Sequence, residues 1–249
     1  PGSVAVMQVI ELWRYPVKSL QGERLQSCEV GELGLAGDRS WGLVDTTSGL
    51  VLTARRVPEL LMASARWVSH DEVVVVLPDG TETNDDAALS DWLGRSVELR
   101  SAADHQFPTY ETPVDDDDDD DDAEARWARW EGPTGVFHDS KRTQVSIASL
   151  TSIGEWDLRR FRQNLIVSGS GEDDLVGRRI TVGDAGLEVT KRIGRCIMVT
   201  RPQPDGIDRD TSVLKTIHRE RESCLGIGAV VTDPGRIDLG DEIVAHPAR

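Results

Sequence analysis

The sequence predicts a mainly β protein of the α+β kind, in which short strands close into a barrel. At least ten short runs of apolar and β-branched residues are separated by turn-forming residues. Few stretches have the periodicity of a helix, and no repeat of fixed period is present. Many short strands combined with few helices are typical of a β barrel.

The first part of the chain is predicted to form strands joined by tight turns. Apolar and β-forming residues indicate the strands, and Pro16 ends the first of them. The glycines between Gly31 and Gly37 allow the backbone to turn tightly or to approach a neighbour closely. Residues 46–49 are predicted to form a hairpin turn. The strands predicted in this part are 4–15, 24–30, 40–45 and 50–54.

The middle of the chain is predicted to hold paired strands and one short helix. Four consecutive valines, Val73 to Val76, indicate a strand that is buried on both faces. Asn84 suits the N-cap of a helix that runs through Leu93 and ends at Gly94. Residues 103–114 lose periodicity, and we expect them to be irregular. The strands predicted in this part are 63–68, 73–77 and 97–100.

The last part of the chain is predicted to alternate strands with two or three helices. A short helix is expected over 123–130, and residues 211–222 have apolar residues on one helical face and charged residues on the other. The strand at 145–150 passes into a helix whose N-terminal N–H groups suit an anion. The strands predicted in this part are 145–150, 165–168, 179–182, 187–191, 197–200, 224–231 and 240–245.

The charge of the chain is strongly negative and unevenly distributed. The net charge is −16, and eight aspartates lie in one run, from Asp115 to Asp122. We expect this run to be a self-repelling, disordered surface loop. A metal-binding tract is the alternative, but the run has no interposed glycine or fixed ligand geometry and does not match a calcium loop. An acidic chain is a poor candidate for non-specific nucleic-acid binding, which depends on neutralising phosphates.

Cysteine usage and hydropathy bear on the compartment. The three cysteines, Cys28, Cys196 and Cys224, are far apart and odd in number, so neither a zinc site nor a disulfide framework is indicated. No apolar run approaches the about 20 residues of a membrane-spanning helix. No signal peptide is visible either. We therefore expect a soluble protein of a reducing compartment, the cytoplasm, without a membrane span.

Cys196 is the cysteine whose sequence neighbours indicate chemistry. It lies between basic residues (Lys191, Arg192 and Arg195) and the apolar run 197–200. Fixed positive charge lowers the pKa of a thiol and makes it a better nucleophile or metal ligand. The alternative interpretation is that Cys196 is a small buried hydrophobic residue, as free cysteines commonly are.

Positive charge in this acidic chain is concentrated at strand ends and in loops. Lys18 and Ser19 follow Pro16, and such a pair suits a phosphate, although for a lone Lys-Ser pair a solvated loop is the more common explanation. The cluster around Arg160 leads into a buried strand, where arginines need an anion or a carboxylate partner. If these cations converge on one pocket, they form a phosphate site beside Cys196. The cations in question are Lys18, Arg39, Arg55, Arg160, Arg162 and Arg195.

Six short motifs, in this order along the chain, resemble those of the MOSC-domain family. Within that family they are most similar to the group of the mitochondrial amidoxime-reducing component and its bacterial relatives. The resemblance covers almost the whole chain. The motifs are Tyr-Pro-Val-Lys-Ser-Leu at 15–20, Gly-Asp-Arg at 37–39, Leu-Thr-Ala-Arg at 52–55, Ser-x-Ala-Ser-Leu at 146–150, Arg-Phe-Arg-x-Asn at 160–164 and Gly-Arg-Cys at 194–196.

The resemblance implies a molybdenum cofactor, a pyranopterin dithiolene (molybdopterin) that carries a phosphate. Cys196 would be the thiolate ligand of the metal and the catalytic residue. A soft thiolate and arginine forks suit a thiophilic metal and a phosphate. Residues that would hold the pterin and its phosphate are Lys18, Ser19, Arg39, Arg55, Ser149, Arg160, Arg162, Asn164 and Arg195.

The resemblance also implies a domain arrangement. A MOSC-type β-barrel would be discontinuous, and a smaller α/β segment would be inserted in it. The expected parts are 4–45 and 123–249 for the barrel, 46–114 for the smaller segment and 115–122 for the acidic loop.

The implied activity is reduction of N-hydroxylated compounds such as amidoximes, hydroxylamines and N-hydroxylated bases. A four-cysteine ferredoxin module, which certain bacterial relatives have, is absent from these 249 residues. Electrons would therefore come from a separate protein, either cytochrome b5-like, a ferredoxin or a flavin reductase. Two departures from the family pattern concern the cofactor segments: Gly194 replaces a cysteine found in some relatives, and Gln163 replaces a common proline. Residues 175–177 lack the tryptophan and glutamate that are usual there, which concerns the substrate pocket.

Two other functions remain open from the sequence. Cys196 could carry a persulfide in a sulfur-transfer reaction, because the family takes its name partly from a cofactor sulfurase. Alternatively, the chain could be a non-catalytic carrier of the molybdenum cofactor. Fold analogy alone does not decide between these functions.

Overall fold

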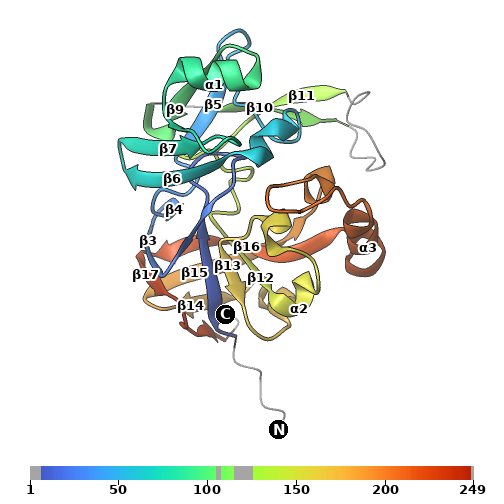
Figure 1. Cartoon of the computed structure of the whole chain (residues 1–249). Coiled ribbons are helices and arrows are strands. Elements are labelled where there is room, and N and C mark those ends of the chain that lie inside the picture. Colours follow the sequence, from blue (N-terminus) through green and yellow to red (C-terminus); the bar gives the residue numbers. More distant parts are fainter. Residues whose placement is uncertain (1–6, 105–107, 115–125, 248–249) are drawn as a thin grey trace.

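The protein is described from a computed structural model, in which residues 7–104, 108–114 and 126–247 are described (Figure 1). Strands make up most of the regular structure, which confirms the mainly β class. The acidic run Asp115–Asp122, expected to be a disordered loop, lies outside the described residues, as do the first residues of the strand predicted over 4–15. The division into a discontinuous barrel and a smaller α/β segment stays a prediction.

The largest sheet has eight strands and curls as part of a barrel in the lower half of Figure 1. Strand β1 lies between β13 and β2 and is antiparallel to both, so the two N-terminal strands β1 and β2 are built into a sheet otherwise made by the second half of the chain. In spatial order the strands are β18 (Ile243–Ala245), β14 (Arg179–Val182), β15 (Ala185–Gly194), β16 (Cys224–Asp233), β12 (Val145–Ser149), β13 (Leu165–Val167), β1 (Val9–Arg14) and β2 (Glu23–Leu25).

Smaller sheets complete the strand structure. One lies beside the large sheet and combines β17 (Gly235–Asp238), β3 (Ser27–Gly31) and β4 (Gly34–Leu35). The others form the upper half of Figure 1. They are β5 (Trp41–Asp45) with β9 (Val97–Ser101), β6 (Ser64–Ser69) with β7 (Glu72–Val76) and β8 (Glu82–Thr83), and β10 (Thr109–Pro113) with β11 (Trp127–Glu131).

The helices are short. Helix α1 begins one residue later than predicted, because Asp85 and not Asn84 is its N-cap and accepts the Ala88 N–H; it ends as predicted at Gly94, whose φ is 63°. None of the helices among the described residues is long and apolar enough to cross a membrane. The helices are α1 (Asp86–Leu93), α2 (Leu150–Ile153) and α3 (Ser212–Arg221), with 3₁₀ turns at Pro58–Met62, Ala102–Asp104, Leu158–Phe161, Glu172–Leu175 and Ile197–Thr200.

Three local predictions are wrong. Residues 197–200 form a 3₁₀ turn and not a strand: β16 begins at Cys224, opposite Gly194, so the chain beyond Gly194 has no strand to pair with. Where a helix was expected over 123–130, the described part is strand β11, and its partner β10 falls in the stretch expected to be irregular. The stack of Trp130 on Tyr110, with ring centroids 5.4 Å apart, favours this pairing.

Two further strand predictions need adjustment. Residues 50–54 return along β5 as an irregular segment with one bridge, Val44 to Val51, and β9 is the regular strand that pairs with β5. The valines of β7 alternate: Val73 and Val75 are buried, whereas Val74 and Val76 are partly exposed. One face of that strand therefore packs on the core, as in an antiparallel sheet.

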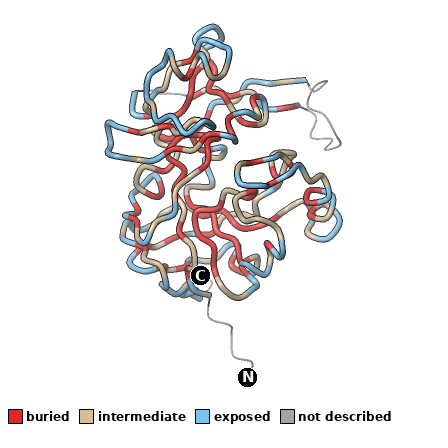
Figure 2. Tube along the Cα trace, viewed as in Figure 1, coloured by how far each residue is buried: buried red, intermediate tan, exposed pale blue. Residues whose placement is uncertain are grey.

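Two large apolar cores lie in the two halves of the molecule (Figure 2). The loop that leaves β1 runs from one to the other. Val17 and Leu20 of this loop are buried in the upper core, and Val17 bridges to Trp41. The loop is consequently fixed on both sides of Lys18 and Ser19, which it holds between the two halves.

Candidate functional site

Lys18 is buried between the two halves and faces one exposed carboxylate. Its ammonium donates to the Phe137 carbonyl at 3.1 Å and to the Asp139 carboxylate at 2.5 Å. It also lies 4.5 Å from the centre of the Tyr110 ring. Only 4% of the Lys18 side chain is exposed, against 90% of that of Asp139. The ion pair therefore lies at the boundary between the interior and solvent.

Arg39 and Arg162 share the ring of Tyr15. Their guanidinium carbons lie 4.6 and 4.4 Å from the ring centre. Arg39 donates to Asp38 at 2.5 Å and to the Arg162 carbonyl at 3.1 Å, and Arg162 donates to the Leu20 carbonyl at 2.5 Å. The two arginines come from segments more than a hundred residues apart, and these contacts bring them together.

The three cations crowd one another. Burial and, second to it, the positive charge of Arg39 lower the pKa of Arg162 to about 10. Burial also lowers the pKa of Lys18, with Asp139 opposing this and both arginines adding to it. Burial raises the pKa of Asp38, but Arg39 and His138 outweigh burial and bring it to about 2. The cluster therefore has more positive charge than its two carboxylates neutralise.

Left-handed backbone conformations coincide with this cluster. Ser19, Arg39 and Arg162 have φ values of 70°, 47° and 52°. Such values are uncommon for residues other than glycine and tend to occur where the surrounding structure has a functional reason to hold them. The Ser19 hydroxyl accepts the Ala54 N–H at 3.0 Å, which ties the Lys18 loop to the segment before Arg55.

Cys196 is half-buried at the start of the 3₁₀ turn that follows β15. Burial raises the pKa of its thiol, and the Met198 N–H, Arg55 and Arg195 only partly offset this. The expectation that basic neighbours lower this pKa is therefore wrong for the ligand-free protein, because desolvation of the thiolate outweighs the two guanidinium charges.

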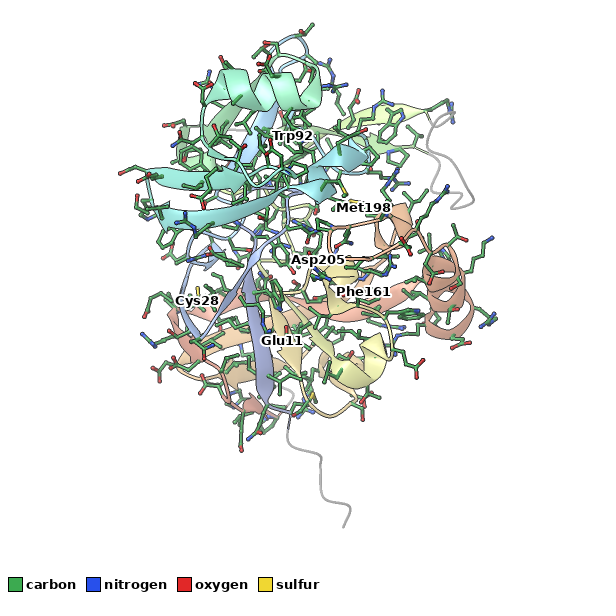
Figure 3. The ribbon with its side chains drawn as sticks, viewed as in Figure 1. Glu11, Cys28, Trp92, Phe161, Met198 and Asp205 are labelled. Carbon is green, nitrogen blue, oxygen red and sulfur yellow. The ribbon has the colours of Figure 1, made fainter. Side chains whose placement is uncertain are left out.

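Arg195 fixes the backbone around Cys196. Its guanidinium donates to the Leu225 carbonyl at 2.8 and 2.5 Å and to the Phe161 carbonyl at 3.0 Å. Burial lowers the pKa of Arg195 to about 10, with the Cys196 and Cys224 thiols opposing this. In Figure 3, Met198, two residues after Cys196, lies between the two halves, whereas Phe161, next to Arg162, lies in the lower half.

Asp139 connects the cation cluster to the cysteine. Its charge acts on Lys18, Arg39 and Arg162, and it also raises the pKa of Cys196. Surrounding protein atoms raise the pKa of Asp139, but Lys18 and the two arginines outweigh them and lower it. Cys196 and the cations thus belong to one electrostatic neighbourhood, in which Arg55 and Arg195 are on the cysteine side.

Three of the residues assigned from the sequence bond to protein groups. Asn164 accepts from the Ser146 N–H and hydroxyl at 3.1 and 2.8 Å. Ser149 caps α2 through the Ser152 N–H. Arg160 donates to three carbonyls, that of Val199 in the 3₁₀ turn Ile197–Thr200 and those of Arg201 and Asp208 after it. In the ligand-free protein these side chains position the elements around the site.

Sequence reasoning missed the acidic and aromatic half of the site. Tyr15 and Tyr110 supply rings for the cations, and Asp38 and Asp139 supply counter-charge. Local sequence gives little signal for them, because any of 44 acidic residues could pair with a lysine. The Tyr110 hydroxyl is buried and has no hydrogen-bond partner among the described residues. An excess of buried cations beside such an orphaned hydroxyl suits an oxygen-rich anion.

Comparison with known proteins gives two family matches and several distant relatives. The model of the MOSC N-terminal beta barrel domain matches residues 6–127, and that of the MOSC domain matches residues 135–244. Mitochondrial amidoxime-reducing component 1 of Mus musculus is 24% identical, over 94% of this chain and 81% of the relative. Mitochondrial amidoxime reducing component 2 of Bos taurus is 25% identical, over 83% and 68%.

Further matches are to longer or more distant proteins. Molybdenum cofactor sulfurase of Drosophila grimshawi is 24% identical over 90% of this chain, which spans about a third (32%) of that relative. Among solved structures, the YUAD protein from Bacillus subtilis is 14% identical with a TM-score of 0.45, over 98% of this chain and 97% of that one.

Proposed function

The chain belongs to the MOSC-domain family, and from this membership we propose that it binds the molybdenum cofactor and reduces N-hydroxylated compounds. The two family models together extend over most of the chain, from residue 6 to residue 244. The relatives named for amidoxime reduction align over most of their own length, whereas the sulfurases exceed this chain about threefold. These alignments favour a reductase of amidoximes, hydroxylamines or N-hydroxylated bases.

One observation carries the proposal: the buried Lys18 and two partly buried arginines from distant segments gather in the electrostatic neighbourhood of a half-buried cysteine. Lys18, Arg39 and Arg162 exceed their carboxylate partners in charge, so a phosphate group would relieve their repulsion. Cys196 offers a thiolate, the ligand type that suits a thiophilic metal. The residues present therefore fit a phosphate-bearing pterin and its molybdenum.

Residue roles follow from these contacts. Lys18, Arg39 and Arg162 would hold the phosphate, and Cys196 would bind the metal. Binding would also favour the thiolate over the thiol, because a metal ion replaces the hydration that burial removes. The bound cofactor would supply the two-electron chemistry that converts an N–OH group, with two protons, to N–H and water. The remaining assignments, Ser19, Arg55, Ser149, Arg160, Asn164 and Arg195, stay proposals.

We propose a separate electron donor, which would be cytochrome b5-like, a ferredoxin or a flavin reductase. The three cysteines of these 249 residues are too few for a four-cysteine iron–sulfur cluster. The proposed location is the cytoplasm, based on cysteine usage.

The test replaces Cys196 and a matched cysteine. We expect Cys196→Ser, in protein expressed with molybdate, to lose at least about a hundredfold in reduction of a benzamidoxime-type substrate while keeping most of its pterin, because the cation contacts remain. Cys224→Ser is the control, since Cys224 is also a half-buried free thiol on the neighbouring strand. Metal analysis and pterin fluorescence measure loading separately from turnover. Wild-type turnover by Cys196→Ser contradicts the proposal.

A sulfur-transfer function is the second candidate, and the sulfurase relatives favour it. In that reaction Cys196 would carry the persulfide. Intact-protein mass spectrometry of metal-free protein distinguishes the two functions, because a persulfide adds about 32 Da to the chain that contains Cys196. We expect no such adduct on wild-type protein that reduces an N-hydroxylated substrate.

A further inference from the structure

Asp139 is the exposed member of the ion pair that neutralises Lys18. Its carboxylate lies 2.5 Å from the Lys18 ammonium, on the solvent side of a lysine that is almost fully buried. The ammonium also donates to the Phe137 carbonyl, which is neutral. Among the described contacts of Lys18, Asp139 is therefore the group that supplies negative charge.

The second carboxylate of the cluster differs from Asp139 in one respect. Asp38 is buried, accepts the Tyr15 N–H at 2.8 Å and pairs with Arg39. Moving Asp38 would break a backbone hydrogen bond and leave Arg39 without its partner. Moving Asp139 needs only a rotation of an exposed side chain into water. Of the two carboxylates, Asp139 is the one that an incoming anion can displace.

We propose that Asp139 is a displaceable counter-ion, which neutralises Lys18 in the ligand-free protein and competes with the oxyanion that binds to Lys18, Arg39 and Arg162. This inference rests on the oxyanion site of the proposed function. It adds that a carboxylate of the protein itself competes with the oxyanion for Lys18. Asp139 is the exposed member of its pair with the buried Lys18, so a ligand that enters from solvent would meet the Asp139 carboxylate first.

Opposite effects on stability and on binding follow from this arrangement. Without Asp139, Lys18 is a buried charge with no carboxylate partner among the residues that the structure describes, so the ligand-free protein is less stable. The same change removes a negative charge that repels an arriving anion, so the anion binds more tightly. A carboxylate with a purely structural role would lower stability and weaken binding together.

The experiment uses the full chain, produced without the cofactor, and inorganic phosphate as the probe. Calorimetric titration of Asp139→Asn is expected to give a phosphate Kd about tenfold lower than wild type, which matches the one pKa unit at the lower end of the effect of a neighbouring charge. Asp139→Glu keeps the charge and should bind like wild type. Asp205→Asn is the matched control, because Asp205 is exposed and pairs with Arg159 at 2.9 Å outside the cluster.

Thermal unfolding supplies the second measurement. Without phosphate, Asp139→Asn should unfold at a lower temperature than wild type, and saturating phosphate should reduce or reverse that difference, since a ligand stabilises the state that it binds. Asp205→Asn should show neither effect. This comparison separates loss of a counter-ion from general removal of one negative charge.

Two outcomes overturn the inference. One is a phosphate Kd for Asp139→Asn that is unchanged or higher than that of wild type, and this leaves the reductase proposal intact because phosphate binding itself persists. The other is the absence of phosphate binding in both proteins, which also removes the oxyanion site from the proposed function. Loss of reductase activity alone does not bear on Asp139, because the titration involves no turnover.

Discussion

Two arginines share one aromatic ring at the centre of the candidate site, and each has a left-handed backbone. That conformation costs about 1–2 kcal/mol for a residue with a side chain. The contacts of Arg39 and Arg162 with Tyr15 and with backbone carbonyls must offset this cost. Burial raises the pKa of Tyr15 to about 12, so its ring stays neutral beneath the two cations. The Asp38 carboxylate is then the group that compensates the charge of Arg39 inside the protein.

Asp38→Asn is therefore expected to destabilise the protein by about 3 kcal/mol at pH 7, because it leaves a largely buried arginine without its partner. The pKa of Asp38 lies at about 2 in the folded protein, below its ordinary value of 3.8. A lowered pKa contributes stability that is fully present above the unfolded value and is lost as the pH falls toward 2. The wild-type advantage should accordingly shrink between pH 4 and pH 2, as measured by urea unfolding.

The control for this prediction is Asp71→Asn, in the exposed turn between β6 and β7. It should change the free energy of unfolding by less than about 0.5 kcal/mol. An Asp38→Asn protein as stable as wild type at pH 7 would show that the ion pair with Arg39 contributes nothing.

Residue-scale sequence reasoning could identify the cations but not their partners. A lysine after Pro16 and arginines at a strand entrance are conspicuous in an acidic chain. Asp38 and Asp139 are two carboxylates among many, and only long-range contacts distinguish them. The prediction of a lowered pKa for Cys196 was wrong for the same reason, because burial depends on tertiary structure and cannot be read from neighbouring sequence.

At the scale of elements, the pair β15–β16 carries the cysteine side of the site. The Leu225 carbonyl of β16 accepts two bonds from Arg195, and Gly226 follows it with a φ of 79°. A Cβ on Gly226 would lie 2.8 Å from the Ile147 carbonyl of β12, which belongs to the backbone and cannot rotate away. Gly194 on β15 has open space around its own Cβ position and an ordinary φ.

Gly226→Ala is therefore expected to destabilise the protein by about 2–4 kcal/mol, from left-handed strain plus the clash with β12. Gly194→Ala is the matched control on the partner strand and should be within about 0.5 kcal/mol of wild type. Chemical unfolding measures both. Equal stabilities for the two variants would contradict the close packing of β16 on β12.

Elements with strong local periodicity were predictable from the sequence, whereas those defined by their partners were not. Helix α1 and strands β6, β7 and β14 agree with their patterns within a residue or two. The run 197–200 has the composition of a strand but lies beyond the end of β16, so it coils into a 3₁₀ turn. Strand β11 has little β-branched character, and its pairing with β10 depends on tertiary contacts such as that of Trp130 with Tyr110.

At the scale of the whole molecule, the large sheet contains strands from both of the regions that the two family models match. The MOSC model begins at residue 135, yet β1 and β2 occupy one edge of the sheet that this part forms. Strand β17 also pairs with β3 from the first part. The apolar core of the sheet includes Val9, Leu12 and Val30. The site has the same dependence, since Lys18 and Arg39 precede the boundary and Arg162 and Cys196 follow it.

A fragment of residues 135–249 is therefore expected not to fold alone, because β13 would lose its partner β1 and the core would lose the side chains that β1 and β3 contribute. Circular dichroism should show no cooperative thermal transition for this fragment. Mixing it with residues 1–134 should restore the transition and phosphate binding together, since the cations of the site come from both pieces. A cooperative transition of the isolated fragment would mean that the sheet folds without its N-terminal strands. The loop between β1 and β2 would then contribute residues to the site without being required for folding of the sheet.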